Sequence, residues 1–264
     1  MEEEYQGALV LPPWEGVCNR CGKETNMHTM SWFNQEYICM ECNDKEEAHP
    51  DIELAKDVEE IGAASILVGG SSATDQMEMA EVVKNLKEAV NIPIILFPGN
   101  ITGVVPQADA ILFSSLMNSE NPYYITQAQA LGAPNVLKFG LEPLPTSYLV
   151  IGEGTSAWFV GNVRGIPFDK PKIAAAYSLA AQFFGMRFVY LEAGSGAKTN
   201  VTPEMVATVR KVFQGFLIVG GGIRDAQTAK SLTDAGADAL VIGTLLEDSN
   251  NLEKLTEIAK AIKN

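Results

Sequence analysis

From residue 50 onward, short apolar runs alternate with amphipathic segments in a regular order. Each apolar run is continuous, which is typical of strands buried on both faces of a parallel sheet. The segments between the runs repeat apolar residues at three- and four-residue spacing, which predicts helices. The predicted strands are 65–70, 92–99, 109–115, 147–152, 187–196, 216–221 and 238–244.

Two of the predicted helices have recognisable ends. The segment 202–213 starts with Thr202 as N-cap and Pro203 at the first helical position. The Ala-rich segment 169–185 ends at Gly185, a residue that commonly stops helices. Further helices are predicted over 74–90, 225–236 and 251–263.

Seven strand–helix alternations over roughly 200 residues predict a (β/α)₈ TIM barrel, which needs eight strands in about 250 residues. The missing strand must then come first, and the run "GALVLP" (7–12) is the candidate ahead of Pro50. We therefore expect an atypical N-terminal segment, 1–48, and a barrel domain, 49–264. An open doubly wound sheet is the competing architecture, but the even strand spacing and the late glycine-rich turns favour the barrel.

Composition narrows the class of protein. The chain has 264 residues, 47% of them hydrophobic, as expected for a globular protein with a substantial core. Its formal net charge of −14 argues against nucleic acid as a partner, because phosphate backbones attract basic surfaces. The acidic start "MEEEYQG" lacks the basic region of a signal peptide, and no apolar run approaches membrane-span length. These features predict a soluble, cytoplasmic protein.

Glycine-rich loops follow three late strands. The loops contain Gly194-Ser195-Gly196, then Gly221 and Gly222, and finally Gly243 and Thr244. In TIM barrels the loops after strands seven and eight often bind phosphate, and backbone amides are the donors that such sites use. We therefore expect these loops to hold a phosphoryl ligand, although ordinary strand-to-helix turns would also explain each glycine run singly.

The sixth barrel strand carries an acid at its carboxyl end. Glu192 and Tyr190 alternate in direction with Leu191, and Glu192 stands where barrel enzymes place catalytic groups. A carboxylate beside a phosphate site is electrostatically unfavourable, which suggests that it has a functional role. Binding polyol hydroxyls, or accepting a proton from one, would be such a role. The alternative is an ion pair with a nearby Lys or Arg.

The N-terminal segment contains all four cysteines of the chain. Two CxxC pairs separated by 17 residues fit a closed structural zinc site, and reduced thiols without metal are the alternative. The segment is similar to small zinc-ribbon proteins, and His28 and His49 are expected to be bystanders. The expected Zn²⁺ ligands are Cys18, Cys21, Cys39 and Cys42.

From about Pro50 to the C-terminus, the chain resembles the geranylgeranylglyceryl phosphate synthase family and its bacterial heptaprenyl relatives. The stretches "ILVGGSSAT", "NITGVVPQADAILFSSLMNSENPYY", "YLEAGSGA", "VGGGIRD" and "ADALVIGTLLE" carry the likeness. The resemblance implies a TIM-barrel prenyltransferase that joins sn-glycerol 1-phosphate to a long polyprenyl diphosphate through an ether bond, with Mg²⁺ on the diphosphate.

By the same resemblance, Glu192 would bind the glycerol hydroxyls and help to deprotonate one, and Ser71 matches the family's Mg²⁺ position on the second strand. A homo-oligomer and transient contact with a membrane surface are also implied. The implied glycerol phosphate site is Tyr190, Leu191, Glu192, Ala193, Gly194, Ser195, Gly196, Gly221, Gly222, Gly243 and Thr244. Candidate aromatic residues lining the prenyl groove are Tyr123, Tyr124, Tyr148 and Trp158.

The sequence differs from the family at the first strand. Family members end this strand in an acidic motif that binds Mg²⁺, whereas "GALVLPPWEG" offers only Glu15, with Asp51 as a further substitute. Losing a carboxylate weakens a magnesium site. A second hypothesis is therefore a catalytically impaired barrel that binds glycerol phosphate and presents the zinc module. A different phosphate-binding barrel enzyme is the third. Prenyl chain length is not determined by these motifs.

Overall fold

The computed structural model describes residues 16–17, 23–25, 28–30, 37–39, 50–70, 76–246 and 251–263. The chain divides into two compact units, Met1–Glu53 and Leu54–Asn264.

In the first unit the structure describes two short antiparallel pairings. The predicted first barrel strand (7–12) lies outside the described residues, as do Cys18, Cys21 and Cys42. Cys39 ends a described strand, of which only the backbone is placed. Zinc binding therefore stays a prediction. The paired strands are β1 (Gly16–Val17) with β2 (Glu24–Thr25), and β3 (His28–Met30) with β4 (Tyr37–Cys39).

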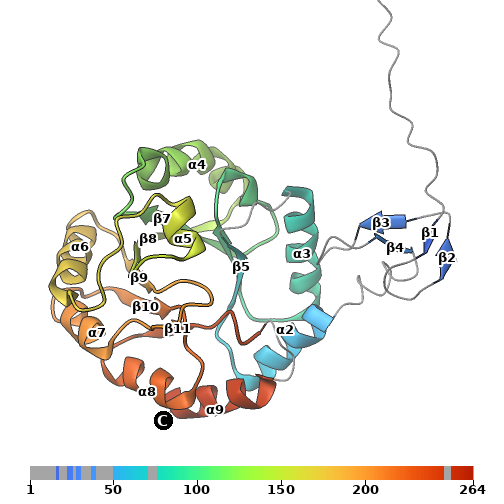
Figure 1. Ribbon diagram of the computed structural model, residues 1–264. Helices are drawn as coiled ribbons and strands as arrows, with labels where there is room; N and C mark the ends of the chain where they lie inside the picture. The colour runs from blue at the N-terminus through green and yellow to red at the C-terminus, as the bar shows by residue number, and fades with distance from the viewer. Residues whose placement is uncertain are drawn as a thin grey trace, which may run out of the picture. The chain divides into compact units, whose positions relative to one another are not determined.

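The second unit contains one seven-stranded sheet in which all neighbouring strands run parallel. Its strands follow chain order, from β5 at one edge to β11 at the other, and curve around a common interior (Figure 1). The seven strands predicted after residue 50 are thus confirmed, in a barrel-like parallel α/β fold. They are β5 (Ile66–Gly70), β6 (Ile94–Pro98), β7 (Ala110–Leu116), β8 (Glu142–Val150), β9 (Phe188–Glu192), β10 (Phe216–Gly220) and β11 (Ala239–Val241).

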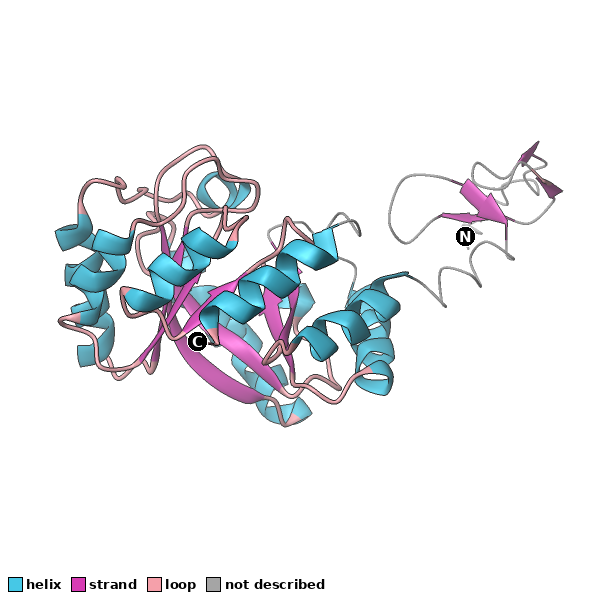
Figure 2. Ribbon diagram, turned by 90° about the horizontal axis from the view of Figure 1, so that it is seen from below, coloured by secondary structure: helices cyan, strands magenta, loops and turns pink. Residues whose placement is uncertain are grey.

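Helices lie around the outside of this sheet (Figure 2). Thr202 caps its helix as predicted, because its side chain accepts a hydrogen bond from the Met205 amide. None of the helices in the described ranges is long and apolar enough to cross a membrane. The helices are α2 (Pro50–Ile61), α3 (Gln76–Ala89), α4 (Ala128–Phe139), α5 (Ser156–Val160), α6 (Pro171–Phe183), α7 (Pro203–Arg210), α8 (Ala226–Asp234) and α9 (Leu252–Ile262), with short turns η1 (Ile101–Gly103) and η2 (Tyr123–Gln127).

Strand β8 is longer than its apolar pattern predicts. It begins at Glu142 and includes Pro143 and Pro145, residues that normally argue against a central strand. Both prolines pair with β7, whereas β9 joins β8 only from Thr146 onward. The missing proline amides therefore interrupt no ladder on the β9 side.

Side chains alternate between two apolar regions. On β9 and β10, Val189, Leu191, Leu217 and Val219 are fully buried against the outer helices. The opposite faces of the same strands point into the interior of the curved sheet, where Tyr190 and Ile218 pack. This alternation places the carboxyl group of Glu192, two residues after Tyr190, inside the sheet and at its carboxyl end.

Candidate active site

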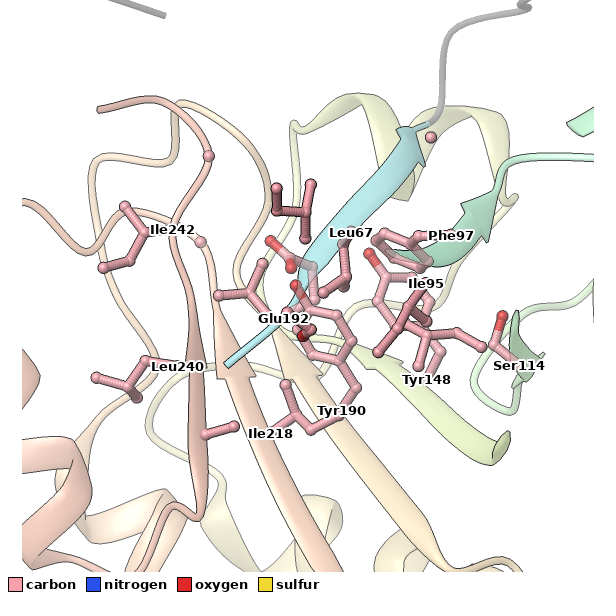
Figure 3. A pocket seen from close by; sticks show the side chains of 18 of the residues that line it. Leu67, Ile95, Phe97, Ser114, Tyr148, Tyr190, Glu192, Ile218, Leu240 and Ile242 are labelled. Carbon is pink, nitrogen blue, oxygen red and sulfur yellow. The ribbon is translucent and has the colours of Figure 1, made fainter. Parts of the chain in front are cut away.

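A cavity of about 1230 Å³ occupies the interior of the sheet. Its walls are mainly apolar side chains from the seven strands and from α2 and α9, and its mouth includes the glycine loops after β9, β10 and β11. Figure 3 shows Glu192 and Tyr190 beside Leu67 and Phe97 within it. The cavity thus joins an apolar interior to a mouth rich in backbone amides.

Glu192 is buried at the mouth, with 7% of its surface exposed. One carboxylate oxygen accepts a hydrogen bond from the Gly194 amide at 2.5 Å, and the Tyr190 hydroxyl donates another. Burial raises the pKa of Glu192 above its ordinary value, and these two hydrogen bonds partly offset that increase. Its partners among the described residues are therefore neutral donors and not a Lys or Arg.

Two aromatic rings hold the Tyr190 side chain in place. Tyr148 packs edge-on against Tyr190 with ring centres 5.1 Å apart, and Phe97 contacts both rings at 5.4 and 5.6 Å. Burial, followed by the charge of Glu192, raises the pKa of both tyrosines well above the ordinary value. Each hydroxyl consequently remains protonated, and that of Tyr190 remains a donor to Glu192.

The three consecutive glycines after β10 allow the backbone to approach this carboxylate closely. A Cβ on Gly220 would lie 2.5 Å from the Tyr190 hydroxyl, and one on Gly221 would lie 2.6 Å from a Glu192 oxygen. Gly221 and Gly222 also have φ of +87° and +71°, which side-chain-bearing residues rarely adopt. Their amides donate to nothing within the described part of the chain. The run therefore presents unpaired donors beside Glu192.

The loops after β9 and β11 contact each other through Thr244. Its hydroxyl accepts a hydrogen bond from the Gly196 amide at 3.1 Å and lies 3.4 Å from the Ser195 hydroxyl. This contact holds the two loops together across 48 residues of sequence. It also uses the Gly196 amide, so that donor is engaged within the protein.

The N-terminal end of α8, the helix after the glycine run, offers less positive potential to an anion than its position suggests. Asp225 caps α8 by accepting hydrogen bonds from the Thr228 amide at 2.8 Å and the Thr228 hydroxyl at 2.9 Å. These bonds hold the pKa of Asp225 below its ordinary value. The positive end of α8 is therefore partly compensated by its own acid.

Most of the predicted headgroup residues meet at the mouth. Tyr190, Glu192, Gly194, Ser195, Gly221, Gly222, Gly243 and Thr244 all line the cavity. The Leu191 side chain and Ala193 instead pack in the core between sheet and helices, because they alternate with Tyr190 and Glu192. Ser71 lies outside the described residues.

The sequence reasoning did not single out Arg224, which also lines the mouth. Its guanidinium lies 3.4 Å from the Gly222 carbonyl. The available signal was a cation two residues after a glycine run. Among the predicted groove aromatics, Tyr124 and Tyr148 line the cavity. Trp158 packs beside Leu116 and Val150, and Tyr123 stacks edge-on against Tyr124.

A magnesium site has no complete ligand set in the described residues. They contain no group of three or more His, Cys, Asp or Glu side chains placed to hold a metal ion. Glu192 is the one buried carboxylate among them, and it already accepts hydrogen bonds from Gly194 and Tyr190. The described donor set therefore does not fit Mg²⁺, which usually takes one or two carboxylates in addition to phosphate oxygens.

Comparison with known proteins places this arrangement in a family. The chain is 79% identical over 210 residues to a geranylgeranylglyceryl phosphate synthase of Nitrosopumilus maritimus, covering 80% of this chain and 84% of that protein. The corresponding protein of Thermococcus kodakarensis is 49% identical over 216 residues, covering 81% and 86%.

A solved structure is similar as well. It is (S)-3-O-geranylgeranylglyceryl phosphate synthase of Thermoplasma acidophilum in complex with sn-glycerol-1-phosphate, and it superposes with a TM-score of 0.78 at 39% identity. The match covers 80% of this chain and 86% of that one. The PcrB family matches residues 30–262. On these matches, and with seven parallel strands whose glycine loops surround Glu192, the chain belongs to the PcrB family.

Proposed function

We propose that this protein is a prenyltransferase that forms an ether bond between sn-glycerol 1-phosphate and geranylgeranyl diphosphate or a similarly long polyprenyl diphosphate. The observation that carries the proposal is Glu192, a buried carboxylate placed between a cluster of backbone amides and a large apolar cavity. The names of the most similar relatives support the same activity. The product belongs to membrane ether-lipid synthesis, and we place the reaction in the cytoplasm.

The phosphate of the glycerol substrate binds at the mouth. The Gly221 and Gly222 amides have no acceptor among the described residues, and Arg224 adds a positive charge at the mouth of a strongly acidic chain. Backbone amides in such a loop bind anions without any helix dipole. The Thr244–Gly196 contact holds the loops after β9 and β11 together at the same mouth.

Glu192 acts on the glycerol hydroxyls. A hydroxyl placed beside its carboxylate gives up its proton to Glu192, and the oxygen bonds to C1 of the prenyl diphosphate. The bond from C1 to the diphosphate oxygen breaks at the same carbon, and the diphosphate leaves with the electron pair. A raised pKa suits this role, because the carboxylate then accepts a proton more readily at neutral pH. Positioning the hydroxyl supplies much of the remaining rate.

The apolar cavity accommodates the prenyl chain. Leu67, Ile95 and Phe97 contribute apolar walls next to the Glu192 carboxyl, and Tyr124 and Tyr148 contribute aromatic ones. Mg²⁺ supplies charge neutralisation to a departing diphosphate in reactions of this class. Because the described residues do not form its site, we assign it no ligand among them and base no step on it.

We also propose that copies of the chain associate. Phe183 and Phe184, at the end of α6, expose 77% and 73% of their surfaces, and such neighbouring aromatics are commonly covered in oligomers. Light scattering on the purified protein tests this, and a monomeric mass at micromolar concentration would contradict it.

The enzyme assignment is tested by a radiolabelled prenyl-transfer assay, run alongside calorimetric binding of sn-glycerol 1-phosphate. We expect ether product and saturable binding. Binding without product would favour the alternative of an impaired barrel that serves as a scaffold. The absence of both binding and product would refute the headgroup site itself.

A further inference from the structure

Asn118 stands where the backbone pairing between β7 and β8 stops. The ladder between the two strands ends with Leu116 opposite Tyr148, and the Met117 amide adds one further bond to the Tyr148 carbonyl. Strand β8 extends beyond this point to Val150, which is fully buried. Buried backbone groups are almost always hydrogen-bonded, so the amide and carbonyl of Val150 both need partners that the β7 backbone does not supply.

The side-chain amide of Asn118 is such a partner. Its Oδ1 accepts a hydrogen bond from the Val150 amide at 3.2 Å, and its Nδ2 donates one to the Val150 carbonyl at 2.9 Å. A side-chain amide carries an acceptor and donors just as a peptide group does. Asn118 thus pairs with β8 as a further peptide of β7 would. Only 2% of its surface is exposed, so water has little access to these bonds.

The same side chain holds the loop that follows β8. Its Nδ2 also donates to the Arg164 carbonyl at 3.1 Å, and the Arg164 amide donates to the Asn118 carbonyl at 2.9 Å. Two residues later the loop returns to β8, where the Ile166 amide donates to the Val150 carbonyl at 3.2 Å. Asn118 therefore lies at the junction of β7, β8 and the returning loop.

Two short routes connect this junction with the carboxylate at the mouth. The first is the backbone of β8, because the Ile151 amide donates to the Glu192 carbonyl at 2.8 Å. The second is the loop, whose Thr155 side chain lies so close to Gly194 that an added Cβ there would collide with it. The Gly194 amide in turn donates to the Glu192 carboxylate at 2.5 Å.

We propose that Asn118 is a positioning residue: its side-chain amide fixes the end of β8 and the following loop, and these hold Glu192 and the Gly194 amide in their relative places. A hydrogen bond as short as the one from Gly194 weakens once its atoms move apart by a few tenths of an ångström. The effect of Asn118 on catalysis rests on the proposed function, whereas its effect on the geometry of Glu192 does not.

Titration of Glu192 by NMR tests this role without an activity assay. The side-chain carboxyl signal is recorded on the full-length protein labelled at glutamate and is assigned with Glu192→Gln. Because the Gly194 hydrogen bond lowers the pKa of Glu192, Asn118→Ala should raise the titration midpoint of that carboxyl group. Exchange of the Gly194 amide with solvent should accelerate on the order of tenfold. A midpoint equal to that of the unaltered protein would overturn the proposal.

A prenyl-transfer assay on the same variant gives a second result. We expect kcat to fall on the order of 10–100-fold for Asn118→Ala, because misplaced catalytic groups lose rate. KM for the prenyl diphosphate should change by less than about twofold, because the cavity is untouched. An unaltered protein that makes no ether product would refute the proposed function but leave the NMR result standing.

The matched control is Val83→Ala. Val83 is fully buried on α3 and does not line the cavity, so its truncation lowers stability away from the mouth. The Glu192 midpoint and kcat should stay unchanged in this variant. Equal shifts in Val83→Ala and Asn118→Ala would overturn the positioning role and leave only a general loss of stability.

The role of Asn118 stays testable if Asn118→Ala does not fold. In the unaltered protein the Val150 amide should exchange as slowly as the amides of central β9, and free exchange there would overturn the proposal. Thr155→Ser keeps the hydroxyl that caps α5 but removes the methyl group against Gly194. It should raise the Glu192 midpoint by less than Asn118→Ala does, and an unmoved midpoint would refute the route through the loop.

Discussion

The late strands β9–β11 and the early strands β5–β8 form two different halves of one sheet. Helices α7 and α8 seal the outer face of the late half, where Met205, Val209 and Leu232 are fully buried. Both halves line the apolar cavity, but the early half is less tightly covered outside, because its helix α4 leaves Leu131 and Leu137 exposed by 61% and 84%.

Under the proposed function, the difference reflects what each half would bind. A small dianion and a proton-accepting carboxylate require donors held within a few tenths of an ångström, and close packing on the outer face provides that rigidity. A flexible hydrocarbon chain requires only apolar volume. We therefore expect substitutions in the late half to abolish chemistry, and those in the early half to change which substrate is accepted.

The largest effect is expected at Glu192. Replacing it with Gln keeps the shape and a hydrogen-bond acceptor for Gly194 but removes the proton acceptor. We expect kcat to fall by about 10²–10⁴, the usual contribution of a general base, while sn-glycerol 1-phosphate still binds. Steady-state kinetics with calorimetry measures both. A kcat within threefold of the unaltered protein would exclude Glu192 as the base.

A smaller effect is expected from Gly221→Ala. The new methyl group would lie 2.6 Å from a Glu192 oxygen and 2.5 Å from the Gly194 nitrogen, so the mouth must distort. We expect sn-glycerol 1-phosphate affinity to fall at least about tenfold, which is about 1.4 kcal/mol.

The matched control for Gly221 is Gly185→Ala. Gly185 has a similar φ of +81°, but nothing lies within 4 Å of its added Cβ. It should lower thermal stability through backbone strain alone, by about 1–2 kcal/mol, and leave affinity unchanged. Equal affinity losses in both variants would mean that general destabilisation, and not the Glu192 contact, is responsible.

In the early half, Ser114→Trp tests the role of the cavity. Ser114 lines its wall, and a large ring there would shorten the space for a prenyl chain. We expect kcat/KM to fall on the order of tenfold for a twenty-carbon diphosphate and little for a ten-carbon one. Leu131→Trp, on the exposed side of α4, is the control. A uniform loss across chain lengths would argue against a tail in this cavity.

The smallest effect is expected on the pH dependence of thermal stability. Because the folded-state pKa of Glu192 is raised above 4.5, the fold favours its neutral form. Its contribution to stability is present below pH 4.5 and is lost as pH rises through the folded pKa. Glu192→Gln should therefore melt higher than the unaltered protein near pH 8, and this advantage should shrink toward pH 4. Parallel melting curves across this range would contradict the raised pKa.

The sequence predicted the late half better than the early half. Strands β9 and β10 begin as apolar runs and lead into glycine-containing loops, and Thr202 and Gly185 mark helix ends by local chemistry. In contrast, α4 was not predicted, because its sequence contains Gly132 and Pro134 and shows little apolar periodicity. Its helical state depends on packing against β7 and η1.

Glu192 and its glycine loops were identifiable from sequence because the residue types alone indicate their task. Their hydrogen bonds were not identifiable from sequence. Whether the Gly196 amide is available depends on Thr244, which lies 48 residues away, and whether α8 can attract an anion depends on where the Asp225 side chain points. Spacing along a chain does not determine such contacts.

The sequence by itself determined the order of strands and helices, the parallel sheet and the residue types at its carboxyl end, because these follow from local periodicity and backbone preference. Only the tertiary structure decided that Tyr190 donates to Glu192 and that Gly220 and Gly221 must lack side chains to lie against them. Those features are distances between segments distant in sequence, and they exist only once the sheet has curved.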